Sequence, residues 1–92
     1  MTLENLKESI RGLSGQEAVK VLSEYIDASP SSPGLDEAYY LRGLKYWGMQ
    51  NRSAAINDYL AAIRINPESR AKEALKFAYD ILDYYNKDLY NP

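Results

Sequence analysis

The stretch from residue 36 to residue 69 constrains the fold more than any other, because its apolar residues recur with the period of a helix and not of a strand. Its first half carries two apolar faces that lie roughly 100–120° apart around a helix axis. One face consists of Tyr39, Gly43 and Tyr46, and the other of Tyr40, Leu44 and Trp47. A helix with two apolar faces must contact two neighbouring helices, or one neighbour and a ligand.

The second half of this stretch carries a single apolar stripe, which predicts a second helix after a break near residues 50–51. The stripe consists of Ala55, Ile56, Tyr59, Ala62 and Ile63. Gly43 and Ala55 are small at the point where the two helices would cross, so we expect a close approach there. Pro67 lacks an N–H group and pushes Asn66 toward extended geometry, so the second helix should end before it.

Taken together, these residues resemble a tetratricopeptide (TPR) repeat, a helix–turn–helix unit of roughly 34 residues. The matching positions are Tyr39, Leu41, Gly43, Tyr46, Ala55, Tyr59, Ala62 and Pro67. Arg42 departs from the pattern where Leu is usual, and we expect its alkyl stem to pack while its charged head reaches water. The turn departs too, because Gln50-Asn51-Arg52 stands where Gly-Asp/Asn-Tyr is common. The resemblance implies an all-α fold of stacked antiparallel helical hairpins.

Residues 1–30 are interpreted as a second, degenerate repeat with a short first helix. Its pattern matches the central repeat at a constant offset of 37 residues, from Ala18 to Ala55 and from Pro30 to Pro67. Ser14 and Glu17 have the spacing of a capping box, which predicts the start of its second helix. Residues 31–34, with Pro and Gly close by, are predicted to form the loop that leads into the central repeat at 36–69.

Residues 70–86 are predicted to form a fifth helix that caps the array, with Ser69 as its N-cap and residues 87–92 as a tail. A stripe for packing on the preceding helix is formed by Ala71, Ala74, Leu75, Ala78, Leu82 and Tyr85. Phe77, Ile81 and Tyr84 widen the apolar arc to about 200° on a helical wheel. A capping helix usually presents a polar outer face, so these three residues predict a dimer or partner surface.

The composition argues against an enzyme, because the chain has no His and no Cys and therefore lacks the commonest general base, thiolate and transition-metal ligands. No Gly-rich loop has the phosphate-binding pattern. Asp80 and Asp83 lie one turn apart and are interpreted as a solvated face and not as a metal or acid–base pair. We therefore expect no catalytic residue, no metal and no cofactor.

The charge and hydropathy patterns limit the partners and the compartment. A net charge of −2 gives no basic footprint for nucleic acid or for an anionic membrane surface. No apolar run approaches the roughly 20 residues that span a bilayer, and the N-terminus lacks the apolar core of a signal peptide. The absence of cysteine fits a reducing compartment, so a cytoplasmic location is expected.

The resemblance implies a concave groove lined by the first helix of each repeat, with Glu37, Tyr40, Leu44 and Trp47 as the groove positions of the central repeat. Packing between helices is the alternative interpretation of Tyr40 and Trp47. Some TPR domains hold a terminal carboxylate with Lys, Arg and Asn in this groove, but Tyr40 and Leu44 occupy two of those places here. We expect a protein–protein interaction module that binds a peptide or protein segment of unknown identity, and poor binding of acidic C-terminal tails. The alternative function is self-assembly, as a homodimer or by partner docking, through Phe77, Ile81 and Tyr84.

Overall fold

The computed structural model describes residues 2–28 and 33–90, with side chains through Tyr84, and it contains helices and loops but no strand in these residues. The five helices are α1 (Leu3–Ile10), α2 (Gly15–Ala28), α3 (Leu35–Gly48), α4 (Arg52–Ile65) and α5 (Ala71–Tyr90). The prediction of an all-α fold with five helices is therefore confirmed.

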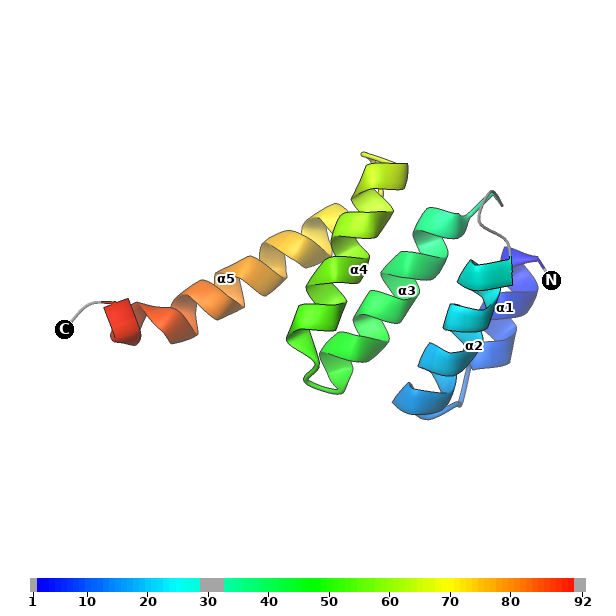
Figure 1. The fold of residues 1–92 in the computed structure, drawn as a ribbon, viewed down its shortest axis with the longest axis horizontal. Coiled ribbons are helices and arrows are strands. Elements are labelled where there is room, and N and C mark those ends of the chain that lie inside the picture. The colour runs from blue at the N-terminus through cyan, green and yellow to red at the C-terminus, as the bar shows by residue number, and fades with distance from the viewer. Residues whose placement is uncertain (1, 29–32, 91–92) are drawn as a thin grey trace.

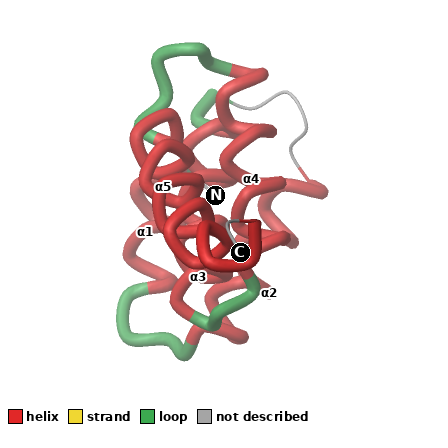
Figure 2. Tube along the Cα trace, turned by 90° about the vertical axis from the view of Figure 1, so that its left-hand side faces the viewer, coloured by secondary structure: helices red, strands yellow, loops and turns green. Residues whose placement is uncertain are grey.

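Each helix packs on its neighbour in the sequence, so that α2 lies between α1 and α3, and α4 lies between α3 and α5. Figure 1 shows α1 and α2 as one antiparallel hairpin and α3 and α4 as a second. Figure 2, turned by 90°, shows the same stack of helices joined by loops. The order of packing follows the order of the chain, as expected for hairpins that are stacked side by side.

Capping side chains place the helix starts where the sequence predicts them. Ser14 Oγ accepts a hydrogen bond from the Glu17 N–H at 3.2 Å and donates one to Glu17 Oε1 at 3.0 Å. At the start of α5, Ser69 Oγ accepts a hydrogen bond from the Ala71 N–H at 3.1 Å. Such contacts satisfy N–H groups that have no partner within the helix, which confirms both predicted caps.

Two clusters of buried side chains form the core, one beneath each hairpin. The first joins α1, α2 and α3 through Leu6, Ile10, Ala18, Leu22, Tyr25, Ile26 and Ala38. The second joins α4 and α5 through Ala55, Tyr59, Ala62, Ala71 and Ala78. Tyr39 packs against both clusters. Of the positions related by the offset of 37 residues, the pairs 18/55, 22/59 and 25/62 are buried in both hairpins, whereas Val19, Ile56 and Ile63 are half-buried. Pro30 and residues 31–32 of the predicted loop lie outside the described residues.

Gly43 allows α3 and α4 to approach closely, as predicted. A Cβ atom at this position would lie 2.6 Å from Tyr59 Cε1 and 3.2 Å from the carbonyl oxygen of Ala55. The first distance is far below ordinary contact between carbon atoms. The crossing therefore tolerates no side chain at Gly43 without displacing the buried ring of Tyr59.

The prediction that the charged head of Arg42 reaches water is wrong. Its guanidinium forms a bidentate ion pair with Asp58 on α4, and Nη1 donates a hydrogen bond to Ser23 Oγ on α2 at 3.0 Å. The group also lies over the rings of Tyr39 and Tyr46. The hydrogen bond to Asp58 raises the pKa of Arg42 above its ordinary value, against the opposing effect of burial. Asp58 is itself buried, and a buried carboxylate requires a partner of this kind.

The last helix differs in length from the prediction, because α5 continues to Tyr90 and not to residue 86. Residues 87–90 thus belong to the helix, and the remainder of the predicted tail lies outside the described residues. The first part of the predicted packing stripe of α5 is present, because Ala71 and Ala78 are buried and Ala74 and Leu75 are half-buried. Leu82 is half-buried as well, and the side chain of Tyr85 lies outside the described part of the chain. Beyond Ala78 the helix leaves the bundle, and Figure 1 shows its C-terminal half running away from the other helices. The radius of gyration of 14.2 Å accordingly exceeds the roughly 12 Å of a compact domain of this length.

A candidate binding groove between α3 and α5

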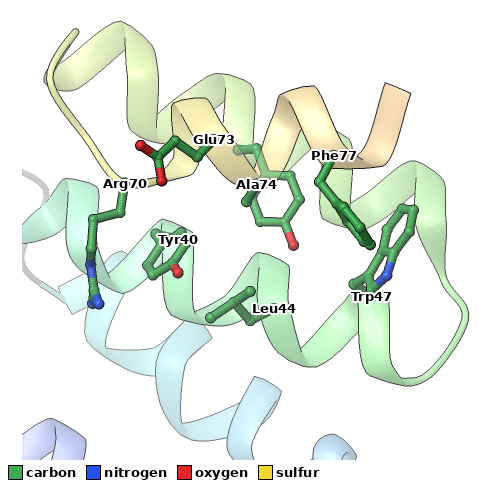
Figure 3. Close-up of a pocket in the computed structure, with 8 residues that line it drawn as sticks. Tyr40, Leu44, Trp47, Arg70, Glu73, Ala74 and Phe77 are labelled. Atoms are coloured by element: carbon green, nitrogen blue, oxygen red, sulfur yellow. The ribbon is translucent and has the colours of Figure 1, made fainter. Parts of the chain in front are cut away.

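An open hollow of about 350 Å³ lies between α3 and the first turns of α5, with α4 behind it. Its lining residues are Tyr40, Leu44, Trp47, Tyr59, Arg70, Glu73, Ala74 and Phe77. We call this hollow the α3/α5 groove. Figure 3 shows Arg70 at one end of the groove, and Trp47 and Phe77 together at the other.

Three of the four predicted groove residues meet in this hollow. Tyr40, Leu44 and Trp47 all face it from α3, at the helical spacing that the sequence shows. Leu44 is the most open, with 41% of its surface exposed. Tyr40 and Trp47 are half-buried and pack against the second core cluster as well, so both of the alternatives considered for them hold in part.

Glu37, the fourth predicted residue, does not line the hollow but holds its polar end in place. Its Oε1 accepts a hydrogen bond from Arg70 Nη2 at 2.8 Å, and its Oε2 lies 3.9 Å from Lys7 Nζ. The guanidinium of Arg70 also lies 4.7 Å from the ring centre of Tyr40. The hydrogen bond to Glu37 raises the pKa of Arg70. Arg70 is thus oriented by a carboxylate and an aromatic face before any ligand arrives.

Aromatic side chains form the opposite end and the floor. Trp47 and Phe77 meet edge to face with ring centres 6.4 Å apart, and Tyr40 and Tyr59 are separated by the same distance. The guanidinium of Arg52 lies 5.1 Å from the Trp47 ring centre. Burial raises the pKa of the Tyr59 hydroxyl, so this group is neutral at physiological pH. Phe77 nevertheless remains 59% exposed, so its ring is available to a ligand.

The predicted surface on α5 is continuous with the groove. Phe77, Ile81 and Tyr84 recur at i, i+4 and i+7, which places them on one side of the helix. Phe77 belongs to the groove, Ile81 is half-buried, and Tyr84 is 74% exposed on the part of α5 that leaves the bundle. We call these three residues the α5 strip. Phe77, which the sequence predicts only for the α5 surface, therefore also lines the hollow that contains Tyr40, Leu44 and Trp47.

Four residues that line the groove are not predicted as binding residues from the sequence, namely Tyr59, Arg70, Glu73 and Ala74. Tyr59 was assigned to the repeat core, where it is also found. Arg70 and Glu73 precede Phe77 by seven and four residues, so helical spacing already places them on its side of the helix. This spacing is the only sequence signal that links Arg70 and Glu73 to the groove. The angle between α5 and α3 is needed to show that both side chains face α3.

The groove offers apolar and aromatic contact, one carboxylate from Glu73 and one oriented guanidinium from Arg70. Within the described residues, no group of three or more acidic or other metal-ligating side chains gathers in one place. Asp80 and Asp83 are both exposed on α5. None of the described helices combines the length and the hydropathy needed to cross a bilayer.

Comparison with known proteins identifies no relative: no family model matches the sequence, and neither the curated proteins nor the solved structures include a match.

Proposed function

We propose that this chain is a non-enzymatic interaction module of the TPR type that binds a peptide or protein segment in the α3/α5 groove. The observation that carries the proposal is the hollow itself, in which three residues expected at groove positions meet Phe77 of α5. Concave, mostly apolar hollows with a few convergent polar groups are the usual binding sites of proteins.

The assignment to the TPR type is supported by packing as well as by sequence. Two antiparallel hairpins bury corresponding positions, such as Ala18 and Ala55, and Gly43 lies at a tight helix crossing. The groove lies between α3 and α5, which are the first helices of successive units in such an array. The cysteine-free composition supports the further proposal of a cytoplasmic location.

The physical basis of binding is the partial exposure of rigid rings. Trp47 and Phe77 each present an edge or a face that their mutual contact leaves open, and aromatic anchors of this kind dominate binding energies at protein interfaces. Arg70 and Glu73 then provide polar contacts that fix the orientation of the segment. Because Arg70 is held by Glu37, little side-chain freedom is lost when a ligand contacts it.

Selection of displayed peptides against the purified chain tests the proposal. Peptides that bind should lose at least about tenfold in affinity to Leu44→Glu, because the new charge lies in the apolar groove. Leu60→Glu is the matched control, since Leu60 lies outside the groove and is exposed to a similar degree, 38% against 41% for Leu44. Circular dichroism should show equal helicity for the two variants. Selected peptides that bind Leu44→Glu and Leu60→Glu equally well would exclude the groove as the site.

Self-assembly through the α5 strip is the second candidate, and the exposure of Phe77 and Tyr84 favours it. A second copy that covers this strip would remove two aromatic rings from water. Light scattering over a concentration series tests this candidate. Dimerisation that is lost in Ile81→Glu with unchanged helicity would support it, and a wild type that stays monomeric at all concentrations would exclude it.

A further inference from the structure

We propose that the partner segment is an amphipathic α-helix with basic residues beside its apolar stripe, and that it lies along both the α3/α5 groove and the α5 strip. This inference rests on the proposed function and specifies the chemistry of its ligand. It is carried by the shape of the apolar surface, by the hydrogen-bonding capacity of its walls and by the charges beside it.

The apolar surface has the length and form of a helix-binding site. From Arg70 at the polar end of the groove to Tyr84 at the end of the strip, the surface follows α5 for about 21 Å, at 1.5 Å per residue. A partner helix of about 14 residues has the same length. The α5 strip is a ridge of side chains with helical spacing. Ridges of this kind pack between the rows of side chains on a second helix.

The walls offer little to the backbone of an extended peptide. They consist of helices, whose own N–H and C=O groups are already paired. Of the side chains in the groove, Arg70 is engaged by Glu37, and Glu73 is the only other charged group. An extended segment would therefore bury backbone groups without partners, at a free-energy cost that a helix avoids by pairing them internally.

The charges beside the α5 strip beyond Phe77 are negative, whereas the groove itself carries Arg70 and Glu73, and Arg52 lies over the Trp47 ring. Glu73 and Asp80 lie seven residues apart and flank Phe77 on α5, and neither forms an ion pair within the described residues. Lys72 and Lys76, the cations of the same helix, line a neighbouring hollow together with Glu68 and Ser69, and this hollow shares Arg70 and Glu73 with the groove. Residues 79–84 contain Asp80 and Asp83 but no Lys or Arg. Lys or Arg on the flank of a partner helix would complement these carboxylates.

The same charges disfavour a second copy of this chain as the occupant. Two α5 helices paired through their strips would bring Asp80 of both copies to the edge of one interface, where like charges repel. A basic partner gains attraction from the same carboxylates. The net charge of −2 for the whole chain acts in the same direction.

Fluorescence titration with three synthetic peptides tests the inference. The first peptide, of about 18 residues, has Leu at i, i+3, i+4 and i+7 positions and Lys on the flanks. The second replaces each Lys by Glu, and the third keeps Lys but has two central Pro residues that prevent a helix. Trp47 is the only tryptophan of the chain and lies in the groove, so its emission reports binding directly. We expect the first peptide to bind at least about tenfold more tightly than the other two.

Charge variants of the chain locate the contact. Glu73→Lys/Asp80→Lys should weaken binding of the basic helical peptide roughly tenfold, since two attractive contacts become repulsive. Glu24→Lys/Asp27→Lys changes the net charge equally but on exposed positions of α2, and it should bind like the wild type. Equal weakening in both double variants would show only a general effect of net charge, and would overturn the assignment of Glu73 and Asp80.

The two proposals fail differently. If the acidic or the Pro-containing peptide binds as tightly as the basic helix and Leu44→Glu abolishes binding, the groove is a peptide site but the inferred helix is wrong. If the basic helical peptide binds Leu44→Glu as well as it binds Leu60→Glu, the inference is wrong because the peptide lies elsewhere. If no synthetic peptide shifts Trp47 emission, the inference is also wrong, and the display selection decides separately whether the groove binds any peptide.

Discussion

Arg42 on α3 donates two hydrogen bonds to Asp58 on α4, from Nε to Oδ2 at 2.8 Å and from Nη2 to Oδ1 at 2.7 Å. Both side chains are largely removed from solvent. The third contact of the guanidinium, to Ser23 on α2, connects the second hairpin to the first. One cation therefore joins three consecutive helices, at a position where tetratricopeptide repeats usually have leucine.

Removal of one partner of this pair should be costly. We expect Asp58→Ala to lower the free energy of unfolding by about 3 kcal/mol, because it leaves the guanidinium of Arg42 buried without its counter-charge. Urea unfolding followed by circular dichroism measures the change. A loss below about 1 kcal/mol, typical of a solvent-exposed pair, would contradict the prediction.

The matched control removes both charges. Arg42→Leu/Asp58→Leu fills the site with apolar groups, and such replacements of buried pairs are often neutral or stabilising. We expect the double variant to be more stable than Asp58→Ala alone by at least about 2 kcal/mol. If the double variant were less stable than Asp58→Ala, the attraction between the two charges would itself stabilise the fold. The pair would then do more than avoid the cost of an unpaired buried charge.

Two glycines of α3 should respond in opposite directions to the same substitution. Gly43→Ala places a methyl group against the Tyr59 ring and should destabilise the chain by about 1–3 kcal/mol through overpacking. A Cβ at Gly48 would have no neighbour within 4 Å, so Gly48→Ala should be neutral or stabilising by up to about 1 kcal/mol. Thermal melting of both variants tests this. Equal changes in melting temperature for the two variants would show that helix propensity, and not the close helix crossing at Gly43, determines the effect of the substitution.

The turn between α3 and α4 contains a strained residue. Gln50 has φ of 64°, the left-handed region that a residue with a Cβ rarely adopts, and it is the only described residue other than glycine with a positive φ. Gln50→Gly should raise the free energy of unfolding by about 0.5–1 kcal/mol, because relief of this strain exceeds the added freedom of the unfolded chain. Gln16→Gly, within the first turn of α2, is the contrasting variant and should destabilise. Chemical denaturation of both variants shows whether each substitution raises or lowers the free energy of unfolding.

Most of the fold could be predicted from the sequence because local features specify it. Helical periodicity located all five helices, and Ser14 and Ser69 marked two of their starts. The small size of Gly43 indicated the crossing before any contact was known. The end of α5 was misplaced because the residues after Asn86 contain no Gly or Pro until the terminal Pro92, so no local signal stops the helix at 86.

The site could be predicted only in part, because it depends on how helices far apart in sequence are placed. Tyr40, Leu44 and Trp47 follow from the register of α3 alone. The contact between Glu37 and Arg70 joins residues on different helices, and the angle of α5 decides it. For the same reason the charge on Arg42 gave no hint of its partner, since Asp58 comes within reach only after α3 and α4 have paired.

The buried hydroxyl of Tyr59 predicts a loss of stability in alkaline solution. Burial raises the pKa of Tyr59 in the folded chain above its ordinary value of about 10. Above that pH the unfolded chain releases the proton while the folded chain still holds it, so the free energy of unfolding falls as the pH rises. Tyr59→Phe has no such proton and should show a smaller fall between pH 9 and 11. Parallel slopes for the two proteins would contradict this assignment.

The first half of α5 should be indispensable for folding, although it belongs to no complete hairpin. A chain that ends at Pro67 loses Ala71 and Ala78, which are buried members of the second core cluster. It therefore exposes the surface around Ile56 and Tyr59. Because a pair of hairpins has little apolar burial to spare, we expect this truncated chain to melt without cooperativity or to aggregate. Truncation after residue 84 retains the packed half and should melt close to the intact chain. Equal, cooperative melting of both truncated forms would show that α5 serves binding alone.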